Sequence, residues 1–186
     1  MPKKKSPDLP IQPLLFNENG YLPHGMHHLN LPSIEFHLVK QAAPSRTRAK
    51  IFTGYMELRA CFETIGANAV QWLDGSFTTT KADPGDINLV SFCDASQIDK
   101  LPDAQFKLLT AYTSGKITKA LCHCDSYIAL NVPEHHPLRE DFETTYNYWL
   151  DLFGNDRTGT PKGIVTTETV AATAKENDSK ATTITA

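Results

Sequence analysis

The amino-acid sequence predicts an α/β (α+β) fold, in which helices pack against a mixed β-sheet. Amphipathic helical segments and short apolar strands follow one another in the order helix, strand, strand, helix, strand, helix. The chain has 186 residues, a length that suggests a single domain. Its hydrophobic content of 40% is ordinary for a globular protein, and a domain of this size buries a core without disulfides.

The first half of the chain is dominated by a long amphipathic helix, predicted over residues 45–66. Its apolar positions recur at spacings of three and four residues: Ile51, Phe52, Tyr55, Leu58, Phe62 and Ile65. Gly66 is a suitable residue for its C-terminal end. A short helix is predicted before it at residues 32–35, with Ser33 as N-cap. A strand is predicted after it at residues 69–73.

The second half alternates strands and helices. Strands are predicted at residues 86–92 and 122–131, with a helix at 103–112 between them that faces inward through Phe106, Leu109 and, as a further candidate, Leu108. Another helix begins at Pro137 and ends at Gly154. Its apolar residues are Leu138, Phe142, Tyr146, Trp149, Leu150 and Phe153, and we interpret the stripe of Tyr146, Trp149 and Phe153 as core. An edge strand is predicted at residues 163–167.

The two ends of the chain are poor in apolar surface. Residues 1–13 hold three lysines and four prolines, and residues 168–186 are rich in threonine, alanine and lysine. Such segments bury too little surface to offset the entropy of ordering them. We therefore expect a flexible basic arm at 1–13, a folded domain at 14–167 and a disordered tail at 168–186.

The composition also bears on the location and partners of the protein. No stretch approaches the length of apolar sequence that a membrane span needs, and no apolar run follows the basic N-terminus. We expect a cytoplasmic protein without a membrane partner, and the four cysteines are then reduced thiols. The net charge of −3 argues against nucleic acid as a partner.

A zinc site is the alternative interpretation of Cys122-His-Cys124, with His135 and His136 downstream. Structural zinc sites usually place two cysteines two to four residues apart, so that a turn directs both sulfurs at one ion. The closer spacing favours two buried cysteines on one face of a strand. The histidine pairs His27-His28 and His135-His136 are interpreted as surface or packing residues.

The residues that are candidates for ligand binding or catalysis lie at and between the first two predicted strands. Gly75-Ser76 follows the first strand, and Asp86 and Asn88 stand on the second. Glycine lets a backbone approach a phosphate closely, and the serine hydroxyl and the turn's N–H groups are phosphate donors. Residues 86 and 88 are two apart, so their side chains leave the same face of a strand and share one site. Their oxygens are ligands of the kind that Mg²⁺ prefers.

Here the sequence resembles the nucleotidyltransferase superfamily, whose signature is Gly-Ser followed by Asp-x-Asp and a later acidic residue. More narrowly, it resembles a family of small, mostly prokaryotic proteins of that fold. The resemblance covers about residues 16–165. Its blocks are Phe16-Asn-Glu-Asn-Gly20-Tyr-Leu-Pro23-His-Gly25, Asp74-Gly-Ser-Phe-Thr-Thr-Thr-Lys81, His136-Pro-Leu138 and the stretch from Tyr148 to Ile164, which includes Arg157 and Lys162.

The resemblance implies a nucleotidyltransferase-like sheet and a site for Mg²⁺ with a nucleoside triphosphate. Gly75 and Ser76 would form the phosphate-binding turn, and Lys81 would neutralise phosphate charge. Asp86 would be the first metal carboxylate, and Asp125 the later acid and second metal ligand. Asn88 stands where the pattern has aspartate. Asparagine offers a carbonyl oxygen but no charge, and one unit charge about 4 Å from a cation is worth about 4 kcal/mol at an effective dielectric near 20.

Asn88 therefore makes the expected catalytic set of Asp86, Asn88 and Asp125 degenerate, unless Asp74 or Asp83 supplies the missing carboxylate. The interpretation we favour is a pseudoenzyme that binds a protein partner in a prokaryotic antiviral defence or toxin–antitoxin setting, where the partner is a toxin or effector. A nucleotide is a candidate second ligand. One alternative is an active Mg²⁺-dependent nucleotidyltransferase that modifies a protein, RNA or small molecule. Another is an interaction protein that binds no nucleotide.

Overall fold

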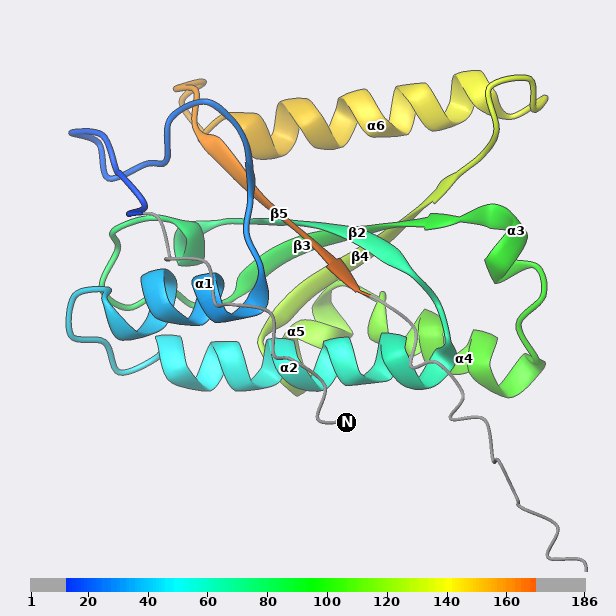
Figure 1. Cartoon of the computed structure of the whole chain (residues 1–186), viewed down its shortest axis with the longest axis horizontal. Helices are drawn as coiled ribbons and strands as arrows, with labels where there is room; N and C mark the ends of the chain where they lie inside the picture. The colour runs from blue at the N-terminus through cyan, green and yellow to red at the C-terminus, as the bar shows by residue number, and fades with distance from the viewer. Residues whose placement is uncertain (1–12, 170–186) are drawn as a thin grey trace, which may run out of the picture.

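The computed structural model describes residues 13–169, which form a five-stranded mixed sheet covered by helices on both faces (Figure 1). The predicted fold class is confirmed. The strands are β1 (Gly25–His28), β2 (Ala69–Asp74), β3 (Ile87–Asp94), β4 (Cys124–Asn131) and β5 (Gly163–Thr169). The helices are α1 (Leu31–Glu35), the π-helical turn η1 (Phe36–Lys40), α2 (Arg48–Ile65), the 3₁₀ turn η2 (Ser76–Thr78), α3 (Ala95–Ile98), α4 (Asp103–Tyr112), α5 (Lys116–Cys122) and α6 (Arg139–Gly154).

The strands lie in the order β1-β5-β2-β3-β4. β1 pairs with β5 and β3 pairs with β4 in parallel, whereas β2 pairs antiparallel with both β5 and β3. The prediction of β5 as an edge strand was wrong, because β1 lies outside it. The four residues of β1 read Gly-Met-His-His, which has no apolar alternation and gives no strand signal.

The domain limits differ slightly from the prediction. β5 continues to Thr169, two residues beyond the expected end at 167. The Thr169 hydroxyl accepts a hydrogen bond of 2.9 Å from the backbone N–H of Ala69 and is buried, so the strand gains a partner that composition does not reveal. The predicted basic arm, except for residue 13, and the tail from residue 170 onward lie outside the described residues.

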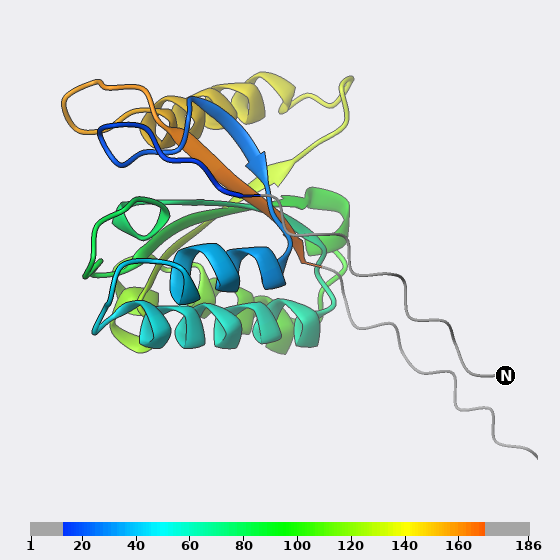
Figure 2. The same ribbon diagram turned by 60° about the vertical axis from the view of Figure 1, so that its left-hand side comes forward.

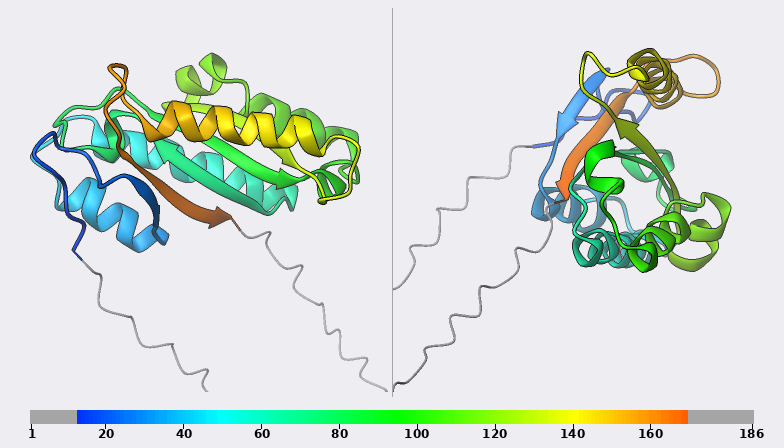
Figure 3. Two further views of the ribbon diagram at one scale, coloured as in Figure 1. Left: turned by 90° about the horizontal axis from the view of Figure 1, so that it is seen from above. Right: turned by 90° about the vertical axis from the view of Figure 1, so that its right-hand side faces the viewer.

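The helices divide between the two faces of the sheet. α1, α2, α4 and α5 lie on one face, and α6 covers the other (Figures 2 and 3). α2 supplies much of the larger core, through Ile51, Tyr55, Leu58 and Phe62. α6 builds a second cluster on the opposite face, where Trp149 and Phe153 pack with residues of the sheet, among them Trp72, Val90, Ala129 and Ile164. The core interpretation of the α6 stripe is therefore confirmed.

The ends of the predicted helices are partly corrected. Gly66 ends α2 in the left-handed conformation with φ of 78°, as expected. α2 begins three residues later than predicted, and the Ser45 hydroxyl accepts a hydrogen bond from the Arg48 N–H. Asn30, and not Ser33, is the N-cap of α1, because its side-chain oxygen accepts the Ser33 N–H at 2.9 Å.

Other positions were misassigned. Cys122 is the last residue of α5, which was not predicted, and not the first of a strand. His123 turns the chain in the left-handed conformation, and β4 then begins at Cys124, so the two cysteines do not share a strand face. Both thiols are buried and free, as expected.

Several apolar residues of the helices also lie outside the core. Phe106 is 50% exposed, whereas Leu109 is buried as predicted, and Leu108 is exposed. α6 begins at Arg139, two residues later than predicted, so Leu138 is its exposed N-cap residue, and Leu150 on the helix is exposed as well. The amphipathic stripes of α4 and α6 are therefore narrower than their apolar residues suggested.

Candidate functional site

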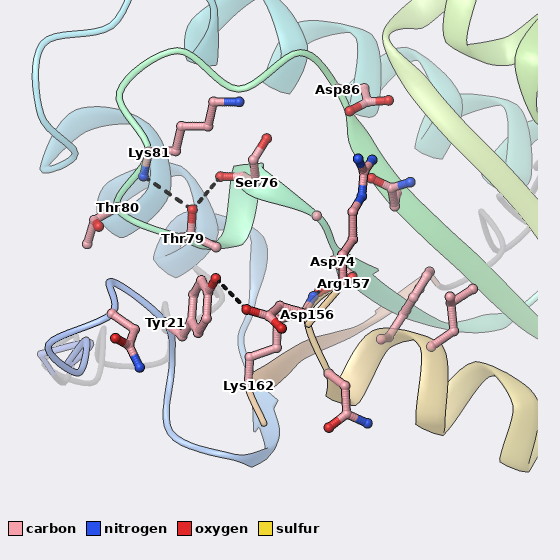
Figure 4. Close-up of a pocket in the computed structure, with 16 residues that line it drawn as sticks. Tyr21, Asp74, Ser76, Thr79, Thr80, Lys81, Asp86, Asp156, Arg157 and Lys162 are labelled. Atoms are coloured by element: carbon pink, nitrogen blue, oxygen red, sulfur yellow. Dashed lines mark hydrogen bonds and ion pairs between the residues drawn. The ribbon is translucent and has the colours of Figure 1, made fainter. Parts of the chain in front are cut away.

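A pocket of about 770 Å³ opens where β2 ends and β3 begins. Its walls come from four parts of the chain: the segment before β1, the β2–β3 connection, the start of β3, and the end of α6 with the loop that follows. The lining residues are Asn19, Tyr21, Asp74, Gly75, Ser76, Thr79, Thr80, Lys81, Asp86, Asn88, Leu152, Phe153, Asn155, Asp156, Arg157 and Lys162 (Figure 4). Five of the six predicted site residues meet here.

Gly75 shapes the turn at the end of β2. Its φ of 85° and ψ of −165° lie in a region that residues with a side chain rarely adopt. A Cβ at this position would stand 2.4 Å from Oδ1 of Asn88. The turn is therefore built around a glycine, and Asn88 packs closely against its backbone.

Gly75→Ala is expected to lower the free energy of unfolding by about 2–3 kcal/mol, because the backbone strain remains even if Asn88 moves. Urea denaturation measures the loss. Gly85→Ala is the matched control, since a Cβ at Gly85 meets nothing within 4 Å; it should change stability by less than about 0.5 kcal/mol. A Gly75→Ala variant as stable as the wild type would contradict the geometry of the turn.

The loop after Gly75 is held from behind by Arg48, which is 1% exposed. Its guanidinium donates hydrogen bonds of 2.6–2.7 Å to the carbonyls of Phe77, Thr79 and Lys81, and a fourth to Leu38. Burial lowers the pKa of this arginine. Because these three loop carbonyls turn inward to Arg48, the guanidinium fixes the course of the loop that carries Ser76 and Lys81.

A buried ion pair forms the floor of the pocket. The Lys162 ammonium contacts Oδ1 of Asp74, and the two side chains are each 8% exposed. Burial raises the pKa of the Asp74 carboxyl, although the Lys162 ammonium opposes the shift. Sequence reasoning named Asp74 only as a substitute carboxylate and did not name Lys162 as a site residue. A lone lysine in the sequence gives no sign of a partner 88 residues away.

Asp74, Asn88 and Asp125 stand side by side on three neighbouring strands, because Asn88 is the register partner of both aspartates. Asp86 and Asn88 both line the pocket, although Asp86 lies just before β3, which begins at Ile87, and not on the strand as predicted. Asp125 does not line it, although its Oδ1 is buried without a hydrogen-bond partner. Asp83 lies elsewhere and is bound by the Arg46 side chain at 2.8 Å, so it does not replace a site carboxylate.

The side chains as arranged do not fit a divalent metal. Oδ2 of Asp86 is 2.5 Å from the Lys119 ammonium, and Asp74 is engaged by Lys162. Asn88 brings no charge, and Asp125 offers a single unpartnered oxygen. Within residues 13–169 no group of three histidine, cysteine or acidic side chains is placed to hold an ion. Mg²⁺ needs several oxygen ligands in near-octahedral geometry, which two lysine-bound carboxylates do not supply.

The opposite wall is the loop at residues 155–162. Asp156 organises it, accepting hydrogen bonds of 2.8 Å from the backbone N–H groups of Thr158 and Thr160, and a bond of 2.9 Å from the Tyr21 hydroxyl. Figure 4 shows Arg157 reaching from this loop toward Asp86. Sequence reasoning missed Arg157, Tyr21 and Asp156 as pocket residues; their presence in the matching blocks was the available signal.

The chain belongs to a family of unknown function (DUF6932), whose model matches residues 14–168. No curated protein and no solved structure matches it significantly. Among the described residues, no helix has the length and apolar character needed to cross a membrane.

Proposed function

We propose that this member of the family of unknown function is a cytoplasmic nucleotide-binding protein of the nucleotidyltransferase type, with a degenerate metal site, that acts by binding a protein partner. One observation carries the proposal: a single pocket is lined by Gly75, Ser76, Lys81 and Arg157, with Ser76 and Lys81 on one side and Arg157 on the other (Figure 4). The resemblance assigns Gly75, Ser76 and Lys81 to a phosphate. Arg157 is a further cation to which it assigned no role.

The chemistry of this set favours an anionic ligand. Arginine and lysine give charge-assisted hydrogen bonds to phosphate, and a hydroxyl adds a neutral donor. Within residues 13–169, neither Lys81 nor Arg157 has an ion-pair partner within 4 Å, so both charges are available. Figure 4 shows Lys81 and Ser76 together at one side of the pocket. A phosphate between them and Arg157 would meet donors from two walls.

The degenerate site supports a role through a partner rather than through catalysis. Asn88 and the lysine-bound carboxylates leave little capacity for the metal that phosphoryl transfer requires. We propose that the partner is a toxin or effector in a prokaryotic defence or toxin–antitoxin setting, and that nucleotide binding changes the affinity for this partner.

Lys81→Ala is expected to weaken nucleotide binding about tenfold, the value of one charge-assisted hydrogen bond of about 1.5 kcal/mol. A nucleotide that binds only the native state raises the melting temperature, so thermal shift identifies a ligand and isothermal titration gives its Kd. Lys50→Ala removes the same charge from an exposed site on α2 and should leave the Kd unchanged. If no nucleotide raises the melting temperature of the wild type, the proposal is wrong.

A second candidate, an active nucleotidyltransferase, is favoured by one observation: the unpartnered Oδ1 of Asp125, beside Asn88 in the sheet. Incubation with α-³²P-labelled nucleoside triphosphates and Mg²⁺ or Mn²⁺ distinguishes the two candidates. Label transfer by the wild type that Ser76→Ala abolishes would establish the enzyme. Transfer only by Asn88→Asp would support loss of catalysis in the natural chain.

A further inference from the structure

We propose that the pocket takes a nucleoside monophosphate, a dianionic phosphate ester, and binds it without a divalent cation. The inference rests on the proposed function, because it concerns the ligand of the same pocket. It departs from the family resemblance, which implies a nucleoside triphosphate with Mg²⁺. The distribution of charge in and around the pocket carries it.

The carboxylates of the pocket already have partners. Asp74 is paired with Lys162, and Asp86 with Lys119 at 2.5 Å. Asp156 accepts hydrogen bonds from Thr158, Thr160 and Tyr21. The two carboxylates that a metal would need, Asp74 and Asp86, are thus each ion-paired with a lysine ammonium group. A divalent ion would have to displace both, and Asn88 between them offers no charge in compensation.

Two cations of the lining remain for a ligand, Lys81 and Arg157. They supply two positive charges, and a phosphomonoester carries about two negative charges near pH 7. A triphosphate carries roughly twice that charge and normally depends on a metal for neutralisation. Without a metal, its additional phosphates would lie in a pocket lined by Asp86 and Asp74. The charge balance therefore favours a single phosphate.

The remaining space suits a nucleoside. The volume of about 770 Å³ is within the range of small-molecule sites. Tyr21, Leu152 and Phe153 give the lining an apolar part, and Asn19 and Asn155 bring amide groups that donate and accept hydrogen bonds. A phosphate between Lys81 and Arg157 leaves this part of the pocket to the sugar and base.

Isothermal titration of the full chain with AMP, GMP, CMP and UMP, and with the four triphosphates, tests the inference in buffers containing either EDTA or Mg²⁺. At least one monophosphate should bind with a Kd that agrees within about twofold between the two buffers. Binding of triphosphates only, and only with Mg²⁺, would overturn this inference and leave the proposed function intact. Absence of binding by any of the eight, in folded protein, would overturn both.

Two variants sharpen the test. Arg157→Gln should weaken the monophosphate about tenfold, since it removes one of two charges that face the phosphate. Asn88→Asp should weaken it in EDTA, because it adds a negative charge to the pocket, and Mg²⁺ should restore the loss. Asn131→Asp adds the same charge at an exposed position of β4 that does not line this pocket, and should change neither Kd. Equal affinity of wild type and Arg157→Gln would count against the phosphate position.

Discussion

Arg48→Met is expected to lower the free energy of unfolding by about 3–5 kcal/mol and to abolish nucleotide binding with it. The substitution leaves four backbone carbonyls without the guanidinium that binds them. A buried acceptor without a partner costs about 1–3 kcal/mol. The total is less than four such penalties, because the carbonyls of Thr79 and Lys81 are only partly buried and water can reach them.

Urea denaturation and nucleotide titration under native conditions measure the two effects separately. Arg48→Lys should fall between wild type and Arg48→Met, since an ammonium keeps the charge but lacks the planar fork of donors. Arg46→Met is the matched control two residues earlier, where the arginine is exposed and binds only Asp83; it should cost less than about 1 kcal/mol. Equal stability of the two methionine variants would refute the structural role of Arg48.

Lys162→Met is expected to lower the free energy of unfolding by about 3–5 kcal/mol near neutral pH, because it leaves the Asp74 carboxylate buried and unpaired. The loss should depend on pH. Burial already raises the pKa of Asp74 in the folded state, and removal of Lys162 removes the group that opposes this shift. Between the unfolded and the raised folded pKa, the folded state binds more protons than the unfolded state, so stability falls as pH rises through that window.

The variant should therefore approach the wild type in acid and lose stability progressively as Asp74 ionises. Denaturation series at several pH values measure this slope. Asp74→Asn/Lys162→Met removes both charges and should recover much of the lost stability, since a neutral amide costs far less to bury than an ion. A double variant no more stable than Lys162→Met alone would show that packing, and not the buried charge, causes the loss.

The sequence predicted those elements whose own residues carry a regular pattern. α2 and α6 have apolar stripes at helical spacing, and β2 and β3 are short apolar runs beside turn residues. Each of them buries one face against the sheet or a helix, so local periodicity and tertiary packing agree. The prediction of α4 matched its limits, but its exposed Phe106 shows that an apolar residue on a helix does not by itself define the buried face.

The missed elements depend on distant partners. β1 has four residues without alternation of apolar and polar side chains, and it forms a strand because it pairs with β5. α5 and β4 meet at His123, whose positive φ divides a run that reads as one strand. The sequence does not reveal the first arrangement, because β1 and β5 are separated by most of the chain. It does not reveal the second, because a non-glycine residue such as His123 rarely adopts a positive φ.

The candidate site was predictable where one short segment supplies it. Gly75, Ser76, Lys81, Asp86 and Asn88 lie within 14 consecutive positions and all line the pocket. The roles of Arg48 and Lys162 could not be predicted from the sequence, because an isolated basic residue is usually solvated. Only the fold shows that these two side chains are buried. The metal and nucleotide assigned from the resemblance remain predictions for the experiments above.

The interior position of β5 has a consequence for the order of folding during synthesis. The sheet acquires the strand between β1 and β2 only when residues 163–169 have emerged from the ribosome. Until then the β2 edge is unpaired on that side, a condition that favours wrong strand pairing and makes early folding slow. Arg157 and Lys162 arrive with the same late segment. The pocket is therefore completed only after this segment has been made, and a ligand that binds there meets a sheet whose five strands are all present.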